Sequence, residues 1–421
     1  MASFSFRAGN ARKIARLPLY ALGRLVTLVL PRTRRWVFGC GAGIGDGPLE
    51  LWRVAQDRGR DAVWLTDDPD EARQAAALGI AALRTSSLAG FWATARAGVI
   101  VVAYGLGDVN PYAISGGLFG RPVVAQLWHG IPLKRVGLDA PETVRSPIPV
   151  AAPLVSRAIG ILYRLSARRI DILPAASHLV RGRLESAFGL PDDRIVVTGE
   201  PRVDALSRGT ADERRAHARA LLRRLIPDLL GGPRLVLYAP TWRDGEPDPA
   251  VPGADDWRAI DETLARHDAV LLVRSHRLGA GDYAPPAGVS RVRALGADVL
   301  GDVTPALPGL DALVTDYSSL AYDVALVPLP VLFLAPDVEA YARRRGFYGA
   351  YGDVAGDDVA TTWGELVPQL DALLGDDAVA AERIRRSRAL SERVHAFRDG
   401  RSAERVYRAI EARIAREEGI G

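Results

Sequence analysis

A histidine and a lysine stand close together after an apolar stretch of the chain, and their side chains could support proton transfer and anion binding. His129 follows residues 122–127, which read as a buried strand, and Lys134 comes shortly after it. Imidazole has an ordinary pKa close to neutrality, so a histidine at a strand exit is a candidate general base. Lys134 is one of two lysines among 54 basic residues, which points to a need for a compact ammonium. A buried histidine in a turn, followed by a solvated lysine, explains the run equally well.

Polar residues also stand at the ends of three other predicted strands, where they could bind phosphate. They are Thr241 and Arg243 after residues 234–239, Arg274 and His276 at the end of residues 269–274, and Asp316, Ser318 and Ser319 after residues 312–315. In open parallel sheets, ligands bind beyond the carboxyl ends of the strands. Hydroxyl and guanidinium donors, with two serines at the start of a helix, suit a diphosphate. Singly, each pattern also fits an ordinary turn, an arginine-rich surface or a plain serine cap.

The elements that must hold these residues alternate between strands and helices in two successive regions. Strands are predicted at residues 36–40, 62–66, 99–104, 122–127, 170–175 and 194–198, and again at 234–239, 269–274, 312–315 and 330–333. Such alternation is typical of α/β proteins with parallel sheets. We therefore expect two doubly wound, Rossmann-like lobes at residues 36–205 and 206–378, with a cleft between them and charged helices at 379–421.

The basic residues of the chain are concentrated at its N-terminus. Residues 1–35 carry eight arginines and lysines and no aspartate or glutamate. Residues 17–30 are strongly apolar, but they fall short of the roughly 20 residues that a membrane span needs. We expect residues 1–35 to be a basic amphipathic segment on an anionic membrane surface, with packing on the protein itself as the alternative. Residues 153–170 form a second amphipathic pattern that is open to the same two interpretations.

Composition and spacing argue against several other classes of protein. Cys40 is the only cysteine, which excludes an internal disulfide and a cysteine-based metal site. The carboxylates of residues 244–256 lack ligand-like spacing, and no metal is expected. Residues 41–47 are rich in glycine, but their spacing does not fit a dinucleotide fingerprint. The basic residues of 1–35 are interleaved with aliphatic rather than aromatic side chains, which disfavours binding to nucleic acid.

Five ordered motifs resemble those of the CDP-glycerol glycerophosphotransferases, the primases and polymerases of wall teichoic acid. They are Q-L-W-H-G-I-P-L-K at residues 126–134, Y-A-P-T-W-R-D at 238–244, R-S-H at 274–276, V-T-D-Y-S-S at 314–319 and R-G-F-Y at 345–348. The similarity also takes in Ser177, residues 188–189 and G-E-P-R-V-D at 199–204, so it runs from about residue 31 to 370. Five motifs in the same order are hard to obtain by chance.

The resemblance implies a GT-B fold and a reaction. Glycerol phosphate, or a related polyol phosphate, would pass from a CDP-activated donor to a hydroxyl of a lipid-linked cell-envelope acceptor, with release of CMP and without a cofactor. His129 matches the general base of the family, and His276 is the second catalytic candidate. The other matching positions are Thr241, Arg243, Arg274, Ser318 and Ser319 for the donor diphosphate, with Lys134, Asp316 and Gly130 in support.

The resemblance places the enzyme at the cytoplasmic face of the bacterial membrane as a peripheral protein. Ile131 stands where the family usually has threonine, and residues 354–358 replace a Pro-Gly-Pro turn, so donor and acceptor details stay open. A GT-B nucleotide-sugar glycosyltransferase is the alternative, because a histidine base and a diphosphate cradle serve both reactions. A sugar-nucleotide 2-epimerase would need a carboxylate pair that the sequence does not clearly show. A non-catalytic membrane-bound scaffold is the remaining alternative.

Overall fold

The computed structural model describes residues 17–114, 116–145, 152–229, 231–241, 243, 247–274 and 283–417. It divides into two compact units. Unit 1 comprises Met1–Gly130, Val136–Asp204 and Ala396–Gly421, and unit 2 comprises Ile131–Arg135 and Ala205–His395. The chain therefore leaves unit 1 directly after Gly130, adds a short segment to unit 2 and returns at Val136. Of the last two helices, Asp377–Val394 belongs to unit 2 and Ser402–Glu417 belongs to unit 1.

Unit 1 is built on a five-stranded parallel sheet. Its strands are β1 (Trp36–Gly39), β2 (Ala62–Leu65), β3 (Ala82–Leu83), β4 (Val99–Val102) and β5 (Val123–Gln126), in the order β3-β2-β1-β4-β5. β1, β4 and β5 are buried along their whole length, which explains their almost entirely apolar sequences. The strand order reverses between β1 and β4, and ligands of such sheets bind outside the strand ends at this switch point.

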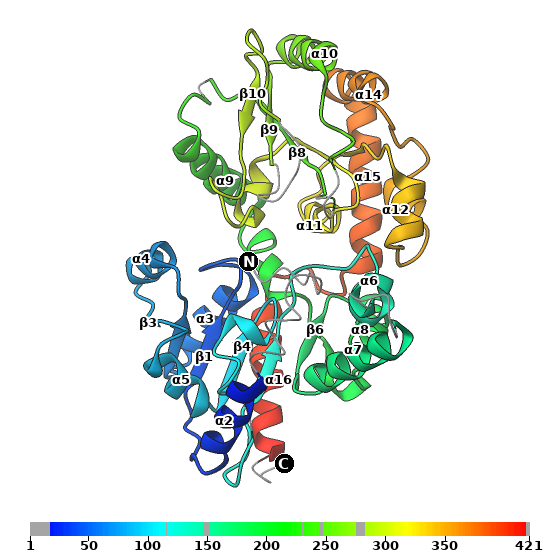
Figure 1. The fold of residues 1–421 in the computed structure, drawn as a ribbon. Helices are drawn as coiled ribbons and strands as arrows, with labels where there is room; N and C mark the ends of the chain where they lie inside the picture. Colours follow the sequence, from blue (N-terminus) through cyan, green and yellow to red (C-terminus); the bar gives the residue numbers. More distant parts are fainter. Residues whose placement is uncertain are drawn as a thin grey trace. The chain divides into compact units, whose positions relative to one another are not determined.

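Helices cover both faces of this sheet (Figure 1). They are α3 (Asp46–Asp57), α4 (Pro69–Ala77), α5 (Leu88–Ala95) and α16 (Ser402–Glu417). α3 and α16 lie side by side on one face, where the Trp36 ring stacks on Tyr407 and Phe38 contacts Trp52. α5 packs on the other face. The rest of unit 1 consists of α2 (Leu17–Leu28), α6 (Pro141–Val144), α7 (Ala152–Ala167), α8 (His178–Phe188) and the parallel pair β6 (Leu173–Ala175) and β7 (Ile195–Val197).

Asp204 ties the C-terminal helix α16 to unit 1. Its buried carboxylate accepts hydrogen bonds from the backbone N–H groups of Ser402, at 2.9 Å, and Ala403, at 2.8 Å. These groups have no partner inside the helix, so Asp204 satisfies them as a cap would. Asp204 closes the motif at residues 199–204, and this motif residue therefore has a structural role.

Unit 2 repeats the same topology. Its strands are β8 (Arg234–Ala239), β9 (Ala269–Val273), β10 (Val292–Ala294), β11 (Ala312–Thr315) and β12 (Val331–Phe333), all parallel, in the order β10-β9-β8-β11-β12. Trp257 and Trp363 pack with Tyr238 in the core of this unit. The helices of unit 2 are α9 (Ala211–Leu225), α10 (Ala254–Arg266), α11 (Leu320–Val324), α12 (Val338–Arg344), α13 (Gly352–Ala355), α14 (Trp363–Gly375) and α15 (Asp377–Val394).

The predicted α/β class with parallel sheets is confirmed, and the ten predicted strands are present. β3 and β10 were not predicted, because runs of two and three partly exposed residues carry no readable periodicity. Of the predicted amphipathic segment 1–35, residues 1–16 lie outside the described residues and residues 17–28 form α2. Most of the second predicted segment, residues 153–170, belongs to α7. In the part of the chain that the structure describes, no helix is both long and apolar enough to cross a membrane.

Candidate active site

His129 stands at the exit of β5, between two residues with positive φ. Trp128 has φ 63° and Gly130 has φ 128°. The left-handed conformation is uncommon for a residue with a side chain and has a strain energy of about 1–3 kcal/mol. Packing holds Trp128 in it, because this buried indole meets the Phe188 ring edge to face at 4.9 Å. Backbone strain is therefore stored directly beside the candidate base.

The imidazole of His129 rests on aromatic rings. Its ring is nearly parallel to that of Tyr104, with centroids 4.6 Å apart and planes inclined by 11°. The Trp128 ring lies 4.1 Å from it. Tyr104 follows β4, which pairs with β5, so the two strand exits lie next to each other. These contacts fix the plane of the imidazole. Sequence reasoning missed Tyr104 as a support, although it stood at the end of the predicted strand 99–104.

Asp108 organises the loop that carries Tyr104. Its buried carboxylate accepts hydrogen bonds from the backbone N–H groups of Ala103, at 3.0 Å, Tyr104, at 2.7 Å, and Gly105, at 3.3 Å. Burial raises the pKa of Asp108 to about 6, against the opposing effect of these hydrogen bonds. A Cβ on Gly41 would lie 3.2 Å from the Asp108 carboxylate and 3.4 Å from the Tyr104 ring, so the glycine-rich loop also packs here.

The raised pKa of Asp108 predicts how stability depends on pH. Folding favours the protonated form, so the contribution of Asp108 is complete below about pH 4 and is lost as the pH rises through about 6. Relative to Asp108→Asn, the free energy of unfolding of the wild type should fall by up to about 3 kcal/mol between pH 4 and 7. Urea unfolding at several pH values measures it. Asp61→Asn, at an exposed carboxylate paired with Arg35, should follow the wild type. Parallel curves for wild type and Asp108→Asn would contradict the prediction.

Arg243 lies buried among carboxylates at the exit of β8. Its guanidinium donates to both carboxylate oxygens of Asp337, at 2.9 and 2.8 Å, and to Oδ2 of Asp316 at 2.9 Å. It also donates to the carbonyl of Thr241. Burial alone would lower the pKa of Arg243, but the hydrogen bonds and charges of Asp337 and Asp316 raise it. The structure thus gives Arg243 other partners than the phosphate oxygens predicted for it, and its charge is neutralised inside the protein.

Asp316 joins the exits of β8 and β11. Its Oδ1 accepts hydrogen bonds from the backbone N–H groups of Thr241, at 2.8 Å, and Tyr317. Tyr351 adds a hydrogen bond from its hydroxyl to the Asp316 carbonyl, at 3.1 Å. Asp316 therefore holds two neighbouring loops together.

The hydroxyl of Thr241 is the unusual polar atom of this site. The residue is 8% exposed, and its Oγ1 is buried without a hydrogen-bond partner among the residues that the structure describes. A buried hydroxyl without a partner costs roughly 1–3 kcal/mol. A polar group kept at such a cost is suited to binding a ligand.

The two serines after β11 differ in their contacts. Ser319 is the N-cap residue of α11, but its side chain makes no capping hydrogen bond. The Ser318 hydroxyl accepts one from the N–H of Leu320, at 3.2 Å. α11 has only five residues, so a strong helix dipole is not available here.

The structure describes only part of the exit of β9, where Arg274 and His276 were predicted to bind phosphate. Arg274 donates to the backbone carbonyls of Leu300, at 2.7 Å, and Gly301, at 2.9 Å, and so braces the loop that follows β10. His276 lies outside the described residues.

Lys134 lies in the short segment Ile131–Arg135, which belongs to unit 2. It forms a β-bridge with Phe347, flanked by hydrogen bonds from Arg135 N–H to the Gly346 carbonyl and from Tyr348 N–H to the Leu133 carbonyl. Two of the predicted motifs, at residues 126–134 and 345–348, are thus paired. The motif of His129 is divided, with His129 and Gly130 in unit 1 and the following residues in unit 2.

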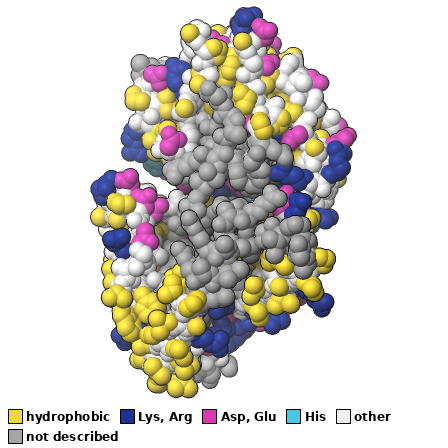
Figure 2. Space-filling view, in the orientation of Figure 1, with side chains coloured by type: hydrophobic (Ala, Val, Ile, Leu, Met, Phe, Trp, Pro, Cys, Tyr) yellow, Lys and Arg dark blue, Asp and Glu magenta, His cyan; other side chains and the backbone are white. Residues whose placement is uncertain are grey.

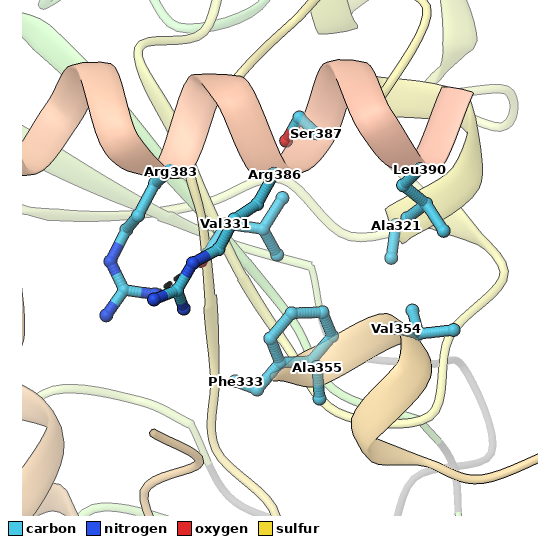
Figure 3. A pocket seen from close by; sticks show the side chains of 9 residues that line it. All are labelled: Ala321, Val331, Phe333, Val354, Ala355, Arg383, Arg386, Ser387 and Leu390. Carbon is cyan, nitrogen blue, oxygen red and sulfur yellow. Dashed lines mark hydrogen bonds between the residues drawn. The ribbon is translucent and has the colours of Figure 1, made fainter. Parts of the chain in front are cut away.

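A small cavity in unit 2 lies between α11, β12, α13 and α15 (Figure 3). Its volume is about 30 Å³, room for about one water molecule, whereas ligand pockets measure several hundred Å³. Arg383 and Arg386 lie side by side at one end, where Arg383 donates to the Val331 carbonyl at 3.0 Å. The cavity is a packing feature rather than a substrate site.

The structure brings together Thr241, Arg243 and Asp316 of the predicted site, with Ser318 and Ser319 on the adjoining turn. Sequence reasoning missed Asp108, Asp337 and the role of Tyr317. Tyr317 lies inside a motif, but no sequence pattern indicated a role for Asp108 or Asp337. The contacts of these two carboxylates become visible only in the folded chain.

Comparison with known proteins shows relatives in teichoic acid synthesis. The chain is 28% identical over 300 residues to a teichoic acid glycerol-phosphate transferase of Staphylococcus aureus, covering 69% of this chain and 71% of the relative. It is 29% identical over 301 residues to the teichoic acid ribitol-phosphate polymerase TarL of the same organism, covering 68% of this chain but 47% of the relative. The chain thus spans about half the length of that polymerase.

The fold and the family model agree with these relatives. A solved structure of the wall teichoic acid polymerase TagF superposes with a TM-score of 0.76 at 21% identity, covering 97% of each chain. This superposition supports the predicted GT-B fold. The predicted transferase class is confirmed by the family model. The family model of CDP-glycerol:poly(glycerophosphate) glycerophosphotransferase matches residues 42–412. The chain belongs to this family of glycerophosphotransferases.

Proposed function

We propose that the protein transfers glycerol phosphate from CDP-glycerol to a hydroxyl of a lipid-linked, teichoic-acid-type acceptor and releases CMP. The family match over residues 42–412 carries this proposal. The structure adds a histidine beside a strained tryptophan at one strand exit, and at another a buried hydroxyl without a partner among the described residues. A relative that is a ribitol-phosphate polymerase makes CDP-ribitol the other donor to examine.

In the proposed reaction, the acceptor oxygen attacks the phosphorus that bears the glycerol. The bond from this phosphorus to the bridging oxygen of the diphosphate breaks, and CMP leaves with that oxygen. His129 takes the proton of the attacking hydroxyl and passes it to water afterwards. Tyr104 and Trp128 hold the imidazole plane during this step.

We assign the donor diphosphate to unit 2 and the acceptor to unit 1. Thr241 would donate its hydroxyl to a diphosphate oxygen, with Ser318 and Ser319 on the adjoining turn. Arg274 and His276 complete the proposed set, and Lys134 supports it. The proposal includes no resident metal.

Release of CMP tests the proposed function. Purified protein is incubated with a detergent-solubilised lipid-linked acceptor and, in separate reactions, CDP-glycerol, CDP-ribitol and nucleotide sugars. The proposal expects acceptor-dependent CMP from CDP-glycerol. Turnover of a nucleotide sugar alone, with a nucleoside diphosphate as product, would instead identify a glycosyltransferase. CMP from CDP-ribitol alone would keep the reaction and change the polyol.

We also propose that α2 binds the cytoplasmic face of the membrane as a peripheral anchor. Gly23 and Thr27 are buried, whereas Leu19, Leu22, Leu25 and Leu28 are 41–67% exposed. Hydrophobic side chains gather over α2 in Figure 2. Within the part of the chain that the structure describes, this apolar face has no partner. The basic charge of residues 1–35 favours anionic lipid as its partner. α7 exposes Leu154, Ile161, Leu162 and Leu165 in the same way.

Replacing Leu22 and Leu25 by glutamine should weaken binding to vesicles of anionic phospholipid by about tenfold or more, because each buried leucine contributes about 1.5–3 kcal/mol. Vesicle flotation measures the bound fraction. Leu78→Gln, at an exposed leucine after α4, is the control and should bind like the wild type. Equal flotation of the double variant and the wild type would show that α2 does not contact lipid.

A further inference from the structure

Three loops of unit 2 meet at Arg243. They follow β8, β11 and β12, three adjacent strands of the sheet, and contribute Thr241, Asp316 and Asp337. Arg243 is 3% exposed, so these contacts lie inside the protein. A buried charge is tolerated when it is paired and hydrogen-bonded, as it is here. The guanidinium therefore connects the loop of Thr241 to the turn of the two serines and to the loop after β12.

Asp337 is the outermost member of this cluster and holds Arg243 most extensively. Both of its carboxylate oxygens accept from the guanidinium, in the planar two-point geometry that makes such pairs strong and directional. One of them also accepts from the Tyr317 hydroxyl, at 2.9 Å. The hydrogen bonds and charge of Arg243 lower the pKa of Asp337, although burial alone would raise it.

Aromatic rings enclose the cluster. The Arg243 guanidinium lies 4.9 Å from the centroid of the Tyr317 ring and 5.1 Å from that of Tyr341. Tyr317 in turn contacts Phe347, with centroids 5.5 Å apart. Phe347 forms the β-bridge to Lys134. The contacts around Asp337 thus extend to the segment that follows His129 along the chain.

We infer that Asp337 is a positioning residue for the donor site, an assignment that rests on the proposed function. Asp337 fixes the guanidinium of Arg243, which fixes the Asp316 carboxylate. Asp316 accepts from the N–H of Thr241 and so sets where the Thr241 hydroxyl lies, which has no partner among the described residues. Without the Asp337 carboxylate, Arg243 keeps its contacts to Asp316 and the Thr241 carbonyl through one nitrogen and loses the two-point contact that fixes the plane of its guanidinium.

Asp337→Asn tests the inference, because it keeps the size of the side chain and removes its charge. We expect kcat/KM for CDP-glycerol to fall about 10–100-fold, mostly through a higher KM for this donor, with the KM for the acceptor unchanged. The affinity for CDP, measured by titration calorimetry, should fall about tenfold. Tyr317→Phe removes only one hydrogen bond to Asp337 and should give a smaller loss of the same kind.

Asp358→Asn is the matched control. Asp358 is a partly exposed carboxylate of unit 2 that pairs with two arginines, Arg383 at 2.7 Å and Arg386 at 2.9 Å, and neither arginine belongs to the proposed donor set. It should lower the melting temperature about as much as Asp337→Asn and leave both KM values unchanged. The inference is overturned if Asp337→Asn binds CDP and turns over CDP-glycerol like the wild type, or if Asp358→Asn shows the same kinetic loss.

The two proposals can fail separately. A wild-type protein that does not turn over CDP-glycerol contradicts the proposed function. A wild-type protein that does, beside an Asp337→Asn variant with unchanged constants, contradicts the positioning role alone. If Asp337→Asn does not fold, Tyr317→Phe takes its place in the kinetic assay and the CDP titration. A higher KM for CDP-glycerol and weaker CDP binding support the positioning role, and unchanged values contradict it.

Discussion

Replacing His129 by alanine is expected to lower kcat by about 10²–10⁴-fold, the usual contribution of a general base. Among the described residues, the predicted site has two members in unit 1, His129 and Gly130, and only His129 can take up a proton. Its ring is held in place against Tyr104 at the exit of β5. The side chain is only partly buried and lies against the rings of Tyr104 and Trp128, so the fold should survive its loss. Acceptor-dependent CMP release measures kcat, and circular dichroism checks the fold.

His217→Ala serves as the control for this experiment. His217 is an exposed histidine on α9 of unit 2, outside the predicted site, so its removal should leave kcat unchanged. If His129→Ala kept kcat within tenfold of the wild type, another group would have to accept the proton. The strain at Trp128 would then serve a different purpose.

Replacing Thr241 by valine should lower kcat/KM by about 10²-fold, comparable to the loss of one donor of an oxyanion site. The melting temperature should stay equal or rise. The hydroxyl is buried without a partner among the described residues, and valine of almost the same shape removes its desolvation cost. Kinetics with CDP-glycerol and thermal unfolding of the free protein measure the two effects.

Thr315→Val is the matched control for stability. Thr315 is fully buried at the end of β11, and its hydroxyl donates to the Ala239 carbonyl at 2.7 Å. Valine there breaks an existing hydrogen bond and should lower the free energy of unfolding by about 1 kcal/mol. If Thr241→Val lost as much stability as Thr315→Val and kept full activity, the Thr241 hydroxyl would have a structural partner and no ligand.

The parts of the site that could be predicted from sequence are those that depend on a few consecutive residues. The strands around His129, Thr241 and Asp316 are short apolar runs with polar exits, and such runs can be read along the chain. The motifs then placed the transferase family correctly. The short strands β3 and β10 and the exact partners of charged residues could not be read in this way.

What could not be predicted depends on contacts between distant residues. Arg243 and Asp337 are 94 residues apart, and Asp204 and Ser402 are 198 apart. Arg243 was therefore assigned to phosphate from its type and position, since its carboxylate partners are far away in the sequence. Asp108 could not be predicted either, because it binds backbone N–H groups, and such binding has no sequence pattern.

The most direct test of phosphate transfer follows the phosphorus that bears the glycerol in CDP-glycerol. This β-phosphorus is labelled, and the donor is incubated with the purified protein and the lipid-linked acceptor. The proposed reaction moves the label into the lipid product and leaves unlabelled CMP, one for each phosphate transferred. Label retained in a nucleoside diphosphate, with only the organic group passed to the acceptor, would contradict glycerophosphate transfer and support a glycosyltransferase-like reaction.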